Sequence, residues 1–64
     1  MPVIQVQLFE GRSVDQKRAL VRELTDALIR TCGGNAAAVH VVIQDVKKEN
    51  WGAGGALCSD TFPD

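Results

Sequence analysis

The sequence predicts an α+β fold in which two parallel strands flank one long helix and a short hairpin follows near the end of the chain. Three observations lead to this prediction: an alternation of apolar and polar residues near the start, a helical repeat of apolar residues in the middle, and a second alternating stretch after a pair of glycines. A strand, a long helix and a second strand in this order form a β-α-β unit, whose strands run parallel. With 64 residues, the chain has room for one domain, residues 1–64.

The first strand is predicted over residues 3–8, because apolar side chains alternate there with glutamines. The apolar side chains that share one face are Ile4, Val6 and Leu8. The glutamines on the other face indicate that this face is only partly buried within one subunit. Residues 10–13, Glu-Gly-Arg-Ser, break the alternation and predict a turn.

A long helix is predicted from Val14 to the glycine pair at residues 33–34. Ser13 is a favourable N-cap, and Gln16 lies three residues later, at the spacing of a capping box. The stripe that repeats every three or four residues consists of Leu20, Leu24, Ala27, Leu28 and Thr31. The glycines end the helix because glycine tolerates the left-handed C-cap conformation.

The second strand is predicted over residues 39–44, where apolar and polar side chains alternate again. Residues 47–50 are charged or polar and predict a solvated loop. Residues 51–55, Trp-Gly-Ala-Gly-Gly, favour a tight hairpin. A short strand is expected around Leu57, before a polar tail.

The short length creates a problem of stability. A domain of about 60 residues buries only about 60% of its unfolded surface, so it usually needs disulfides, a metal or partner subunits. Cys32 and Cys58 allow one disulfide at most, and the first residues carry no export signal, so we expect a reducing compartment, the cytoplasm. One histidine and two scattered cysteines do not form a zinc site, and no metal is expected. We therefore expect a homo-oligomer, in which another subunit covers the sheet face that the helix leaves open.

Composition and motifs exclude several functions. Seven Lys and Arg against eight Asp and Glu give a formal net charge of -1, which argues against a nucleic-acid partner. No apolar run approaches the roughly 20 residues that span a membrane. The sequence contains no Ser-His-Asp arrangement, phosphate loop or metal cluster, and both cysteines are expected to be structural or incidental.

Pro2 is the unusual residue. A small residue after the initiator methionine usually permits removal of that methionine, which would give Pro2 a free secondary amine. This amine is the only base in the chain that burial and nearby cations could tune from alkaline toward neutral. A structural explanation is also available, since the missing N–H of proline is harmless at the start of a strand. If Met1 is retained, the Pro2 nitrogen is an amide, and a non-catalytic oligomeric binding protein is the alternative.

Three segments together resemble the 4-oxalocrotonate tautomerase family. They are Met-Pro at the start, Glu-Gly-Arg-Ser at residues 10–13 before the long helix, and Trp-Gly-x-Gly-Gly at residues 51–55. The resemblance covers nearly the whole chain. It implies the β-α-β tautomerase fold, assembled as a hexamer of small subunits. It also implies a cofactor-free keto–enol tautomerase, an isomerase that acts on an unsaturated 2-hydroxy or 2-oxo acid such as 2-hydroxymuconate.

The resemblance implies a role for Pro2, Arg12 and Trp51 in a site assembled from more than one subunit. Pro2 would be the general base that moves a proton between an enol oxygen and a carbon. Arg12 would bind a substrate carboxylate, which suits the bidentate geometry of a guanidinium. Trp51 would line an apolar wall. Desolvation there and repulsion from Arg12 would keep the pKa of the Pro2 amine low.

His40 stands where well-known family members carry a second arginine on the second strand. A neutral imidazole cannot form the same bidentate fork, and a protonated one offers a single donor on each side. Four explanations therefore stay open: His40 is a weaker donor that binds substrate, another residue takes over, the substrate differs, or His40 has no catalytic role.

A second reaction class also stays open. Relatives use the same proline for hydration-dehalogenation or decarboxylation, typically with a carboxylate that activates water. Asp45 and Glu49 are only loose candidates for that carboxylate.

Overall fold

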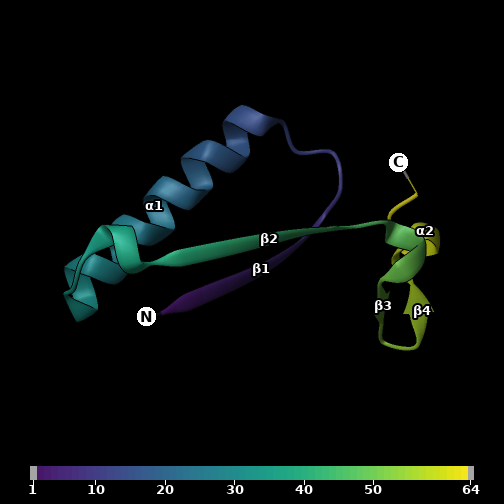
Figure 1. Ribbon diagram of the computed structural model, residues 1–64. Helices are drawn as coiled ribbons and strands as arrows, with labels where there is room; N and C mark the ends of the chain where they lie inside the picture. The colour runs from purple at the N-terminus through teal and green to yellow at the C-terminus, as the bar shows by residue number, and fades with distance from the viewer. Residues whose placement is uncertain (1, 64) are drawn as a thin grey trace.

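The computed structural model describes residues 2–63 and contains a β-α-β unit followed by a small C-terminal unit (Figure 1). The elements in chain order are β1 (Val3–Phe9), α1 (Val14–Cys32), the 3-10 helix η1 (Ala36–Ala38), β2 (His40–Val46), the 3-10 helix η2 (Lys48–Asn50), β3 (Gly52–Ala53), β4 (Ala56–Leu57) and α2 (Cys58–Thr61). The predicted α+β class, with parallel strands, one long helix and a C-terminal hairpin, is confirmed.

Strands β1 and β2 pair in parallel, from Val3 opposite His40 to Phe9 opposite Val46. Both strands run further than predicted, because the pairing continues to Val46 and the N–H of Glu10 donates to the Val46 carbonyl oxygen at 3.0 Å. The second strand also begins one residue later than predicted, since Val39 caps η1. Exposed and half-buried side chains alternate along β1 as the sequence indicates.

Helix α1 begins with the predicted capping box. The Ser13 hydroxyl accepts from the Gln16 N–H at 3.1 Å, and the Gln16 amide oxygen accepts from the Ser13 N–H at 2.9 Å. At the other end, the Gly33 N–H donates to the Ile29 carbonyl at 2.9 Å. Gly33 has a φ of 78°, which glycine adopts without the steric cost of a Cβ. Figure 1 shows α1 on one side of the β1–β2 pair.

The C-terminal unit contains the predicted hairpin and a helix that the sequence does not predict. Gly54 and Gly55 connect β3 and β4, and their positive φ values of 64° and 86° are those of a type I′ turn. The sequence predicts only a polar tail after the short strand, whereas residues 58–61 form α2. The N–H of Cys58 donates to the Trp51 carbonyl at 2.7 Å, and its side chain is only 2% exposed. Four residues are too few to show a helical repeat.

One copy of the chain leaves much apolar surface open. Among residues 2–63, Cys58 is the only fully buried residue. The radius of gyration is 14.7 Å, whereas a compact chain of this length has about 11 Å. The accessible surface is 4788 Å², whereas a compact monomer of this mass exposes about 4000 Å². This extended shape favours an oligomer.

Two simpler features complete the description of the fold. Cys32 and Cys58 are both free thiols. Within residues 2–63, no helix combines the length and the apolar character that crossing a membrane requires.

Ser13→Ala should destabilise the protein by about 1 kcal/mol, because the substitution leaves a helix N–H without its side-chain acceptor. The measurement is urea unfolding followed by circular dichroism at one fixed protein concentration. Ser59→Ala is the matched control, since the Ser59 hydroxyl makes no hydrogen bond within the described chain. Equal midpoints for the two variants would contradict the role given to the cap.

Candidate active site

Pro2 and His40 lie next to each other at one end of the parallel strand pair. Pro2 directly precedes β1, and its carbonyl oxygen accepts from the His40 N–H at 3.0 Å. His40 is the first residue of β2 and is exposed, as is Pro2. The parallel ladder therefore fixes the backbone of Pro2 while its surroundings stay open to a ligand.

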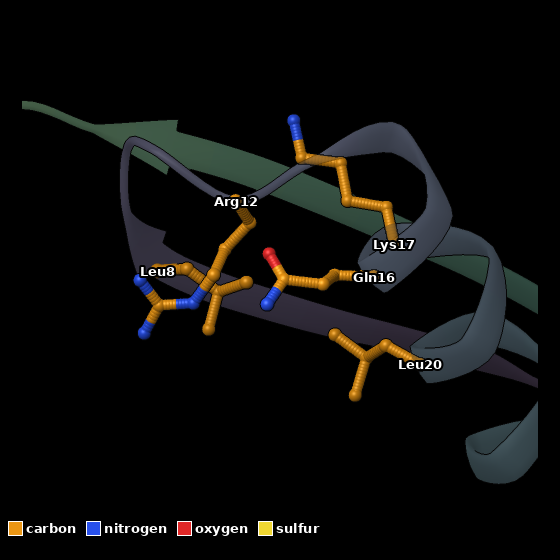
Figure 2. A pocket seen from close by; sticks show the side chains of 5 residues that line it. All are labelled: Leu8, Arg12, Gln16, Lys17 and Leu20. Carbon is orange, nitrogen blue, oxygen red and sulfur yellow. The ribbon is translucent and has the colours of Figure 1, made fainter.

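Arg12 lies in the loop between β1 and α1, at the edge of a cavity of about 240 Å³ (Figure 2). The cavity is lined by Leu8, Arg12, Gln16, Lys17 and Leu20. The two leucines supply an apolar surface, and Arg12 supplies a cation. Within the described chain, the Arg12 guanidinium has no hydrogen-bond or ion-pair partner. An anionic group could therefore take both of its paired donors.

Lys17, the second cation of the cavity, is already engaged. Its ammonium forms an ion pair with the Asp45 carboxylate at 2.5 Å, which ties α1 to β2. Figure 2 shows the Lys17 ammonium directed away from the other lining side chains. Asp45 is opposite Leu8 in the strand register, far along the sheet from Pro2. This pairing leaves Asp45 a weak candidate for activating water beside Pro2 within one subunit.

Trp51 lies beyond the other end of the strand pair. It caps η2, and its ring meets the Phe9 ring edge-on, with 4.8 Å between centroids. The Phe62 ring lies 6.4 Å from that of Phe9, and the Lys48 ammonium lies 5.7 Å from the same ring. These contacts hold the C-terminal unit against the end of β1. Glu49 is exposed within η2 at this end of the molecule.

One subunit therefore separates the predicted site residues into two groups. Pro2 and His40 lie at the start of the strands, whereas Arg12 and Trp51 lie beyond their end. A strand of seven residues separates the groups by about 20 Å, at about 3.3 Å per residue. One end offers a candidate base and a side-chain donor, and the other offers a cation and an aromatic surface. A small acid cannot bridge this distance, so one subunit does not bring the four predicted residues together in a single site.

The sequence prediction missed Gln16 and Lys17 as residues of the Arg12 cavity. A signal for Gln16 exists, because the capping-box spacing from Ser13 turns its side chain back toward the turn that carries Arg12. No comparable signal exists for Lys17, because its partner Asp45 lies 28 residues further along the chain.

The chain is similar to known proteins along almost its full length. The sequence pattern of the family described as "Tautomerase enzyme" matches residues 2–61. A protein of Staphylococcus aureus named "probable tautomerase" is 47% identical over 60 residues, which cover 94% of this chain and 98% of that protein.

Solved structures show the same similarity. A 4-oxalocrotonate tautomerase isozyme from Methylibium petroleiphilum is 43% identical and has a TM-score of 0.85, with 91% of this chain and 94% of that chain covered. A heterohexameric 4-oxalocrotonate tautomerase from Chloroflexus aurantiacus is 32% identical and has a TM-score of 0.88, with 94% of this chain and 97% of that chain covered.

Proposed function

The chain belongs to the family of tautomerase enzymes, and from this premise we propose that it catalyses the cofactor-independent keto–enol tautomerisation of an unsaturated 2-hydroxy or 2-oxo acid such as 2-hydroxymuconate. One observation carries the proposal: the family match extends over residues 2–61 and begins at Pro2. The match thus includes the one residue whose backbone nitrogen could serve as a tunable base.

In the proposed reaction, the Pro2 amine is the general base. It accepts the proton of the enol hydroxyl, so that an O–H bond breaks and an N–H bond forms. The conjugated electrons of the substrate shift to make the carbonyl. The protonated Pro2 amine then returns the proton to a carbon of the substrate. Protons and electrons balance without an oxidant or a reductant. The proposal includes the removal of Met1, a residue that lies outside the described part of the chain. While Met1 is attached, the Pro2 nitrogen is an amide and has no basic lone pair.

Three other residues would hold the substrate. Arg12 would bind a carboxylate, and its lack of a partner within residues 2–63 supports this role. Trp51 would provide an apolar wall that disfavours the charged form of the Pro2 amine. His40 would donate a single hydrogen bond close to Pro2, and the hydrogen bond between their backbones supports that position.

We also propose that the active form is a homo-oligomer, a hexamer in the cytoplasm. The Chloroflexus aurantiacus relative is a heterohexamer, and its assembly supports the number of subunits proposed here. The sheet face that bears Val3 and Val42 supports it further, because these apolar side chains are 57% and 53% exposed in one subunit. An assembly that covers this face would also bring together groups that lie at opposite ends of one subunit.

Pro2→Ala should lower kcat for ketonisation of 2-hydroxymuconate by a factor of about 10² to 10⁴, the usual contribution of a positioned general base. The assay is the loss of enol absorbance in purified protein whose N-terminus has been identified by intact mass. Wild-type protein that retains Met1 should show the same loss of kcat, although residue 2 is not substituted. An unchanged rate in both forms would exclude the proline mechanism.

A haloacrylate assayed beside the enol acid separates the proposed reaction from the alternative reactions of the family. Halide release that is faster than ketonisation, and that depends on Asp45 or Glu49, would replace the tautomerase proposal by a hydratase-dehalogenase.

Arg12→Ala should lower kcat/KM by about 10- to 100-fold, because a hydrogen bond to a charged group contributes about 1.5–3 kcal/mol. Arg12→Lys should restore only part of the loss, since an ammonium lacks the bidentate fork. Arg22→Ala is the matched control, because Arg22 is an exposed arginine of α1 that does not line the cavity. A normal kcat/KM for Arg12→Ala would remove Arg12 from the site.

Val42→Glu should split the oligomer and abolish activity together, because it places a charge on the sheet face that the proposed assembly would bury. Size-exclusion chromatography with light scattering gives the mass, and the enol assay on the same fractions gives the activity. Arg22→Glu, the control, also makes the net charge more negative, but on the exposed face of α1. It should leave the mass of the oligomer and the activity unchanged. Full activity from a monomeric Val42→Glu protein would show that one subunit holds a complete site.

A further inference from the structure

The orientation of the Gln16 side chain is fixed by the start of α1. Its amide oxygen accepts from the Ser13 N–H at 2.9 Å. A backbone N–H can only donate, so the oxygen must face the backbone and the amide NH₂ must face away from it. Figure 2 shows the Gln16 nitrogen directed into the space between Arg12 and Leu20. The capping box thus presents two N–H donors to the cavity.

These donors have no acceptor within the part of the chain that the structure describes, and neither has the Arg12 guanidinium. Lys17 differs, because Asp45 already binds its ammonium. The cavity therefore combines apolar leucine side chains with two sets of free donors that come from residues four apart. This arrangement favours a ligand with an apolar body and an oxygen-rich end.

We propose that Gln16 is a further substrate-binding residue, whose amide donates to the carboxylate that Arg12 binds. This inference rests on the proposed function, since it names a second group for the same acid. A carboxylate has about four lone-pair positions, of which the Arg12 fork occupies two, so an acceptor site remains for the amide. The amide adds this bond without adding charge, and its cap bond keeps it in place before the ligand arrives.

The test measures binding separately from turnover. The probes are 2-hydroxypentanoate, a saturated acid that cannot tautomerise along a conjugated chain, and its methyl ester, both titrated by calorimetry into the assembled protein. Turnover is measured in parallel with 2-hydroxy-2,4-pentadienoate. For the acid, Gln16→Met should raise Kd about tenfold, because it removes a donor to a charged group without adding a charge. KM should rise by a similar factor while kcat changes less than threefold, and binding of the ester should change little.

Two further variants separate ligand binding from helix capping. Gln16→Glu keeps an acceptor for the Ser13 N–H, since glutamate also completes a capping box, but it loses the donor. It should bind the acid at least as weakly as Gln16→Met, with the helix content of the wild type. Val14→Glu adds the same charge nearby on α1, at a side chain that is 61% exposed and does not line the cavity, and should leave Kd within twofold.

If Gln16→Met binds the acid with the Kd of the wild type, the inference is overturned. This holds even if Gln16→Glu binds the acid weakly, because charge repulsion between two carboxylates would then explain the weaker binding. The absence of measurable acid binding to the wild type would overturn it as well. Failure of the proposed function gives a different result: no ketonisation by the wild type, with the tenfold change in Kd still present.

Discussion

The burial of apolar side chains on both faces of a two-stranded sheet is the constraint on which the rest of this structure depends. Helix α1 covers one face, and nothing among residues 2–63 covers the face that bears Val3 and Val42. Hydrophobic stabilisation scales with the apolar area removed from water, so burial of that face against other copies would stabilise a chain of this size. The same requirement would permit a divided site, because a subunit of the proposed oligomer need not hold all of its functional groups together.

The turn between β1 and α1 contains both the cap that stabilises the helix and the arginine that lines the cavity. Ser13 and Gln16 satisfy each other's backbone N–H groups, and this fixes where the helix begins. Arg12 directly precedes the cap, so the cap also fixes the loop from which the guanidinium extends. The ion pair between Lys17 and Asp45 then ties the first turn of the helix to β2. The capping box and this ion pair therefore determine where the helix begins, and they also position the side chains that line the cavity.

Local chemistry made most of the fold predictable from the sequence. The alternation in 3–8, the cap at Ser13 and the glycine pair each act over a few residues, and the structure has the strand, the helix start and the helix end that they indicate. The helix after Leu57 was not predicted, because α2 depends on the burial of Cys58 and on the hydrogen bond from the Cys58 N–H to the Trp51 carbonyl across the hairpin. Pairings that join residues far apart in the chain, such as Lys17 with Asp45, leave no local pattern. The site residues themselves stay a prediction from the resemblance, and the separation of these residues between two ends of the subunit follows from the strand register.

The hydrogen bond between the Pro2 carbonyl and the His40 N–H has a consequence for the entropy of the reaction. Chain ends usually fray, and ordering one residue's backbone costs about 1–2 kcal/mol. Here the second residue is tied into a parallel ladder through its carbonyl, so loss of the preceding methionine would release the nitrogen and leave the residue anchored. The ordering of this end is completed when the sheet forms. In the proposed reaction, substrate would therefore meet a chain end that is already ordered, and its affinity would not be reduced by the need to immobilise that end.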